Sequence, residues 1–211
     1  MLLLMACLML FLIGCDGDIT ADLYALDILD AAEGELLYTK ATLIFESPGS
    51  SAAETTQQII KRYFRNADNF RTQQREIYEY TVVDFELPVI RLVDYAPGED
   101  ILTLVVELSD GGIHFGLAFN QKRFAELAAV VEDEFWQALS PKDFVIFVDF
   151  SNDLREPVTV RLEGVYVNQQ PILYAAEYSL SRREGVMIKL SDIMHDYLYA
   201  NQLVLIGELK Q

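Results

Sequence analysis

The sequence predicts an α+β fold: a mainly antiparallel sheet, or sheets, with two long helices and one short C-terminal helix packed on it. Over most of the chain, hydrophobic and polar residues alternate with the two-residue period of a strand, which indicates a sheet with one buried face. Two longer stretches have the spacing of an amphipathic helix instead. The turn at residues 109–112, Ser-Asp-Gly-Gly, separates two apolar runs as in a β-hairpin, so neighbouring strands are expected to be antiparallel.

The first half of the chain is expected to hold strands around one long helix. Residues 19–23 alternate between apolar and polar and predict a first strand, and residues 37–45 repeat the pattern. Ser-Ala-Ala-Glu at 51–54 has the spacing of a capping box, so a helix is expected from there to about Phe70. A long strand with one inward face is then expected over 83–89.

The second half repeats this mixture of strands and helices. After the hairpin, Asn120 is placed to cap a helix that runs to about Leu139 with one apolar stripe. Residues 144–150 are almost wholly apolar, as in a strand at the centre of a sheet. The remaining expected elements are a hairpin of 158–167 with 172–180, a short helix capped by Ser191 that runs to about Ala200, and a closing strand over 203–209.

Composition excludes two classes of protein. With 16 Lys+Arg against 33 Asp+Glu, the formal net charge is −17, and a surface this acidic repels nucleic acid. Hydrophobic residues make up 52% of the chain, which is ample for a buried core, so intrinsic disorder is excluded as well.

The start of the chain resembles the signal of a bacterial lipoprotein. The apolar run from Leu2 to Ile13 is shorter than the ~20 residues of a membrane-spanning helix and fits the apolar region of a secretory signal. It ends in Leu12-Ile13-Gly14-Cys15, which resembles a lipobox. One departure is that no Lys or Arg precedes Lys40, so either the start codon lies upstream or export is inefficient.

The lipoprotein resemblance implies attachment of diacylglycerol to the thiol of Cys15, then cleavage between Gly14 and Cys15, and then attachment of an N-acyl chain to the new amino group of Cys15. No other cofactor is expected. Asp16 resembles the sorting residue that retains lipoproteins in the inner membrane, facing the periplasm. Because Cys7 leaves with the signal and Cys15 carries lipid, no disulfide is expected in the mature chain.

These patterns divide the chain into three predicted parts. Residues 1–14 are predicted to be the signal peptide, and residues 15–35 a lipidated acidic segment that contains the first strand. Residues 36–211 are predicted to form the α+β domain, either undivided or built from subdomains at about 36–119 and 120–211.

No catalytic residue and no metal ligand is predicted. The two histidines, His114 and His195, lack the spacing of a metal site, and no nucleophile elbow, phosphate-binding loop or dinucleotide motif is present. The sequence therefore predicts a non-enzymatic protein.

Five basic residues cluster after position 60 and are the candidate binding patch. They could bind lipid headgroups or an acidic partner beside the membrane, or they could be cations that stabilise the C-terminus of a helix. They are Lys61, Arg62, Arg65, Arg71 and Arg75.

Residues 15–24 and the later Glu-Leu-Pro-Val-Ile at 86–90 resemble small bacterial lipoproteins of unknown function, including ones carried on prophages. This resemblance implies no catalytic residue. The expected function is a lipid-anchored module that binds an envelope protein. The alternatives are a lipid or small-molecule carrier with an apolar pocket and, third, a carboxylate-dependent hydrolase of envelope polymers.

Overall fold

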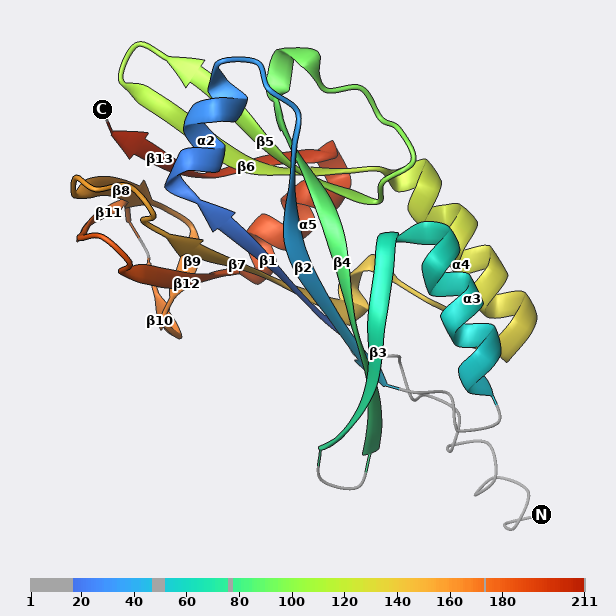
Figure 1. Cartoon of the computed structure of the whole chain (residues 1–211). Coiled ribbons are helices and arrows are strands. Elements are labelled where there is room, and N and C mark those ends of the chain that lie inside the picture. The colour runs from blue at the N-terminus through green and yellow to red at the C-terminus, as the bar shows by residue number, and fades with distance from the viewer. Residues whose placement is uncertain (1–16, 47–51, 76–77, 173, 211) are drawn as a thin grey trace.

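One sheet of 13 strands dominates the structure, a computed structural model that describes residues 17–46, 52–75, 78–172 and 174–210 (Figure 1). The strands are β1 (Gly17–Tyr24), β2 (Leu37–Glu46), β3 (Arg65–Arg75), β4 (Tyr78–Arg91), β5 (Leu102–Ser109), β6 (Gly112–Phe119), β7 (Phe144–Ser151), β8 (Val158–Leu162), β9 (Val165–Val167), β10 (Gln170–Pro171), β11 (Ala176–Leu180), β12 (Gly185–Leu190) and β13 (Leu203–Lys210). The helices in these ranges are α2 (Ala25–Ala32), α3 (Ala53–Tyr63), α4 (Gln121–Phe135) and α5 (Asp192–Asn201), with 3-10 turns η2 (Leu92–Asp94) and η3 (Pro141–Asp143).

The prediction of an α+β fold with two long helices is wrong, because the sheet makes up most of the structure and the helices are short. The first expected helix ends at Tyr63 rather than near Phe70. Asn66 and Asn69 have positive φ angles of 49° and 50°, which a helix does not allow, and the ladder between β3 and β4 shifts register there. Residues 65–75 thus form a strand, because they hydrogen bond to the backbone N–H and C=O groups of β4 on the side away from β2, which would otherwise be unpaired.

The second expected helix also ends early. Asn120 caps α4 as predicted, since its Oδ1 accepts a hydrogen bond from the Arg123 backbone N–H at 3.1 Å. The helix stops at Phe135 because Trp136 takes a left-handed conformation with φ 58°. The predicted cap of the third helix is confirmed, with Ser191 Oγ 3.3 Å from the Met194 nitrogen. Ser51, the first residue of the predicted capping box, lies outside the described residues.

Strand β1 lies in the middle of the sheet and joins its two parts. It pairs parallel with β7 and antiparallel with β2, and the alternation predicted for residues 19–23 is confirmed: Ile19, Ala21 and Leu23 are buried. The sheet order is β10-β9-β12-β7-β1-β2-β4-β5-β6-β13-β8-β11, with β3 on β4. Besides β1 with β7, the pair β4 with β5 is parallel, and the other pairs are antiparallel.

The sheet wraps around its own core. Phe115 on β6 and Phe150 on β7 stack with their ring centroids 5.7 Å apart, although β1, β2, β4 and β5 lie between these strands in the sheet order. Contact across that separation requires strong curvature, which Figure 1 shows as a continuous twist. Helix α2 covers strands β1, β2, β4, β5 and β6, and its Ala25, Ile28 and Ala31 are fully buried.

A bent hairpin supplies both outer strands of the sheet. The predicted pairing of 158–167 with 172–180 is present, but the chain bends at Gly164, whose φ is +70°. Before the bend β8 pairs with β13, and after it β9 pairs with β12, so the two halves of the hairpin extend opposite ends of the sheet. One hydrophobic core includes side chains from residues 17–35, 36–119 and 120–211.

Candidate functional site

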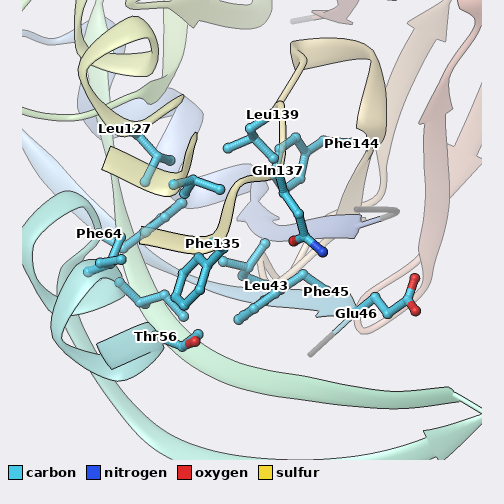
Figure 2. Close-up of a pocket in the computed structure, with 13 residues that line it drawn as sticks. Leu43, Phe45, Glu46, Thr56, Phe64, Leu127, Phe135, Gln137, Leu139 and Phe144 are labelled. Atoms are coloured by element: carbon cyan, nitrogen blue, oxygen red, sulfur yellow. The ribbon is translucent and has the colours of Figure 1, made fainter. Parts of the chain in front are cut away.

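An apolar concavity lies between α3, α4 and one end of the sheet (Figure 2). Its cavity volume is about 70 Å³, and it is open on one side. Helices α3 and α4 pack against each other here, and their apolar faces form two of its walls. The lining residues are Leu43, Phe45, Glu46, Thr56, Ile59, Ile60, Phe64, Leu127, Val131, Phe135, Gln137, Leu139 and Phe144, and we call this site the α3–α4 pocket.

Thr56 contributes an unsatisfied hydroxyl to the α3–α4 pocket. Its side chain is 5% exposed, and Oγ1 is the one buried side-chain polar atom in the described ranges that has no hydrogen-bond partner. Figure 2 shows it on the α3 wall, beside the ring of Phe135. A buried hydroxyl without a partner costs roughly 1–3 kcal/mol, so a ligand with a hydrogen-bonding group would recover part of that free energy.

The N-terminal end of β1 lies directly beside the α3–α4 pocket. Gly17 pairs with Phe45 on one side and Phe144 on the other, and both phenylalanines line the pocket. A Cβ atom on Gly17 would lie 2.8 Å from the ring of Phe144, so a larger residue would displace that ring. The first described residue of the chain therefore lies beside this pocket.

The single tryptophan of the chain lies at the same end of the molecule. Trp136 is 93% exposed, and its neighbours Phe135 and Gln137 both line the pocket. The preceding helical turn is acidic, because Glu132, Asp133 and Glu134 are exposed and no basic residue lies in the last turn of α4. Carboxylates at a helix C-terminus interact unfavourably with the helix dipole, and they give this side of the pocket a negative potential.

The five residues of the candidate basic patch do not share one environment. Lys61 and Arg62 lie in the last turn of α3. The Nζ atom of Lys61 lies 5.4 Å from the centroid of the Phe70 ring. The Cζ atom of Arg62 lies 5.6 Å from the centroid of the Tyr63 ring. Arg75 is the last residue of β3.

Arg65 and Arg71 are held by carboxylates on the sheet. Arg65 forms a bidentate pair with Asp100, with nitrogen–oxygen distances of 2.9 and 3.1 Å. Arg71 lies 2.9 Å from Asp84, and its guanidinium holds the pKa of that carboxyl below its usual range. Neither guanidinium is therefore free to bind an external anion without breaking an existing pair.

His195 forms a side-chain pair with Tyr199 on α5. The Tyr199 hydroxyl lies 2.6 Å from His195 Nε2, and the imidazole also hydrogen bonds to the backbone of Phe144. Burial lowers the pKa of His195, against the smaller opposing effects of Asp196 and Asp192, and burial raises the pKa of Tyr199. Both groups are thus neutral at pH 7 and serve to attach α5 to the start of β7.

Two carboxylates stand side by side on the other face of the sheet. Asp22 on β1 is in register with Asp149 on the parallel strand β7. Burial raises the pKa of Asp22, and Asp149 raises it further, while Lys40 lowers it. Such a pair is what a carboxylate-dependent hydrolase would need, but neither residue lines the α3–α4 pocket.

Other candidate features lie elsewhere or outside the described chain. The lipobox and sorting residues, Leu12 to Asp16, precede the described ranges. Within those ranges no cluster of three or more His, Cys, Asp or Glu could hold a metal ion. The described helices likewise include none with the length and apolar character needed to cross a bilayer.

Sequence reasoning did not find the α3–α4 pocket. The sequence predicts apolar faces for both helices, but an apolar face has the same pattern whether it meets a packed neighbour or an open cavity. Thr56 carries no sequence signal, since its unsatisfied hydroxyl depends on which side chains surround it.

The comparisons with known proteins give one match. A family model described as "Domain of unknown function (DUF7424)" matches residues 17–208. No curated protein and no solved structure matches the chain. The match begins at Gly17, the first residue of β1.

Replacing Thr56 by valine is expected to stabilise the unliganded protein by about 1 kcal/mol, because the substitution removes an unsatisfied buried hydroxyl and keeps the shape of the side chain. Thr39 is the matched control, since it is also 5% exposed but its hydroxyl donates to the Asp22 carbonyl at 2.8 Å. Thr39→Val should destabilise by about 1 kcal/mol. Urea unfolding measures the free energy of unfolding of both variants. A change in the same direction for both would contradict the claim that, of these two hydroxyls, only that of Thr56 lacks a partner.

Acidification should weaken the attachment of α5. The pKa of His195 is lower in the folded than in the unfolded chain, where it is near 6.5, so the unfolded state binds more protons as the pH falls. The stability that the neutral imidazole supports is present above pH 6.5 and is lost below it. Between pH 7.5 and pH 5, the thermal unfolding midpoint should fall less for His195→Gln than for wild type. Equal falls in the two midpoints would refute the role of His195.

Proposed function

We propose that this chain, which belongs to the family described as Domain of unknown function (DUF7424), is a lipid-anchored envelope protein that binds its partner without catalysis. The α3–α4 pocket is the proposed binding site. The observation that carries the proposal is the place where the chain enters the fold: Gly17 lies between two phenylalanines of that pocket.

The lipobox supports the anchor, and the position of β1 gives it a structural consequence. Only Asp16 separates Cys15 from Gly17, so lipid on Cys15 would be attached within about 7 Å of the sheet, at ~3.5 Å per extended residue. The domain would then rest directly on the membrane surface with its pocket end towards the lipid. Retention in the inner membrane, facing the periplasm, is the location that Asp16 favours.

The chemistry of the pocket supports binding of an apolar group. Its walls are almost wholly hydrocarbon, and its one buried polar group without a partner in the described chain is the uncharged Thr56 hydroxyl. Its volume of about 70 Å³ is less than half that of the ~150 Å³ protein cavity that accepts benzene. The space therefore suits one aliphatic side chain or the end of an acyl chain, and it is too small to enclose a whole lipid as a carrier would.

Removal of the lipid attachment site tests the anchor. Cys15→Ala is expected either to leave the protein unprocessed or to release it from the detergent phase of a phase partition, while its thermal unfolding midpoint stays unchanged, because Cys15 precedes β1, the first described strand. Cys7→Ala is the matched control and should partition as wild type does, since Cys7 belongs to the segment removed with the signal. A Cys15→Ala chain that has lost residues 1–14 and still partitions as wild type does would exclude a lipid anchor.

Filling the pocket tests binding. Leu139 is a half-buried residue of the pocket wall outside any helix or strand, so Leu139→Trp should occupy the cavity with little disturbance of the sheet. Crosslinking in intact cells is expected to recover an envelope protein with the wild-type chain and at least fivefold less with Leu139→Trp.

Val93→Trp is the control for an added tryptophan, because Val93 is 77% exposed in η2. It lies just beyond Arg91, the last residue of β4, which is about 33 Å along the strand from Thr81, the partner of Phe45. Equal recovery with the two tryptophan variants would show that the pocket is not the binding site.

A further inference from the structure

We propose that, in the absence of a partner, the α3–α4 pocket holds the end of an acyl chain attached to Cys15 of the same protein. This inference rests on the proposed function, because it requires both the lipid anchor and the pocket. It adds the identity of a ligand: a methylene chain supplied by the protein's own anchor.

The short distance between the anchor and the pocket favours this ligand. Gly17 is in register with Phe45 and Phe144, which line the pocket, and Cys15 is two residues away. An acyl chain on Cys15 is therefore at the high effective concentration of an intramolecular ligand joined by a very short linker. A free phospholipid has no such advantage.

The size and lining of the pocket suit part of a methylene chain. Hydrocarbon side chains from β2, α3, α4 and β7 surround a space of about 70 Å³ that is open on one side. Several methylene groups can enter through the open side while the rest of the chain stays outside. No charged group is needed to fix such a ligand.

The charge around the pocket decides between the anchor and a bilayer phospholipid. Glu132, Asp133 and Glu134 are exposed in the last turn of α4, next to the pocket residue Phe135. These carboxylates repel the phosphate of a phospholipid headgroup. A thioether-linked diacylglycerol and an N-acyl amide carry no charge, so only the anchor lipid reaches the pocket without this repulsion.

Occupancy of the pocket would couple binding to anchoring. A single acyl chain gives only marginal membrane binding, whereas two or three anchor stably. A partner that enters the pocket would displace the acyl chain into the bilayer, and it would thereby tighten the attachment of the protein to the membrane.

Photocrosslinking within the full lipidated chain tests the inference. Trp136 is replaced by p-benzoylphenylalanine, a substitution that removes little packing because this side chain is 93% exposed beside the pocket. After irradiation of membranes, mass spectrometry is expected to find residue 136 joined to the acyl chain on Cys15. Adding Leu139→Trp should reduce this product at least fivefold, and adding Cys15→Ala should abolish it.

Two controls separate the pocket from general contact with lipid. The same photoreactive residue at Val93 should not give the internal product, because that position lies at the far end of β4. If Leu139→Trp loses its thermal transition, Leu139→Phe makes a smaller addition to the same wall. An internal product that neither variant reduces would overturn the inference.

The products also separate this inference from the proposed function. Crosslinks from position 136 only to free phospholipid would overturn the inference in favour of a bilayer ligand. Crosslinks only to another protein would overturn it too, but they would leave the proposed binding module intact. If the phase partition shows that the protein carries no lipid on Cys15, both the proposed function and this inference are wrong.

Discussion

The hydrogen bonding of β1 to both β7 and β2 is the interaction on which the rest of the structure depends. In the sheet order, β1 is the link between the β10-β9-β12-β7 group and the strands that begin with β2. Its parallel ladder with β7 joins strands that are far apart in the sequence, and its antiparallel ladder with β2 joins near neighbours. The bent hairpin of β8 to β11 connects the outer ends of the two groups, and Phe115 and Phe150, one from each group, stack between them.

The same strand connects the fold to the start of the chain. Gly17, the first described residue, already lies in a strand in the middle of the sheet. Among the acidic residues of 17–35, Asp22 lies on that strand, and Asp27 lies on α2, where its carboxylate accepts a hydrogen bond from the Tyr24 backbone N–H. Burial raises the pKa of both carboxyls, which is a cost that the surrounding core offsets.

The α3–α4 pocket is the place where this well-packed structure is incomplete. Elsewhere in the described core, side chains such as Phe150, Leu162 and Ile188 are fully buried. At the pocket, the helices meet the sheet without filling the space, and Thr56 retains an unsatisfied hydroxyl. Local conflicts of this kind in an otherwise consistent fold are typical of binding sites, where the ligand completes the packing.

The sequence by itself determined the local elements whose cause is local. The alternation at 19–23, the caps at Asn120 and Ser191, and the hairpin across residues 109–112 are visible without neighbours, because backbone geometry and side-chain period set them. The tertiary structure decided the rest. Residues 65–75 became a strand because β4 offered unpaired backbone groups, and α2 formed where its alanines could approach the sheet. The pocket and its hydroxyl arise from the spacing of α3 and α4 over the sheet, a property of three segments together that no single one encodes.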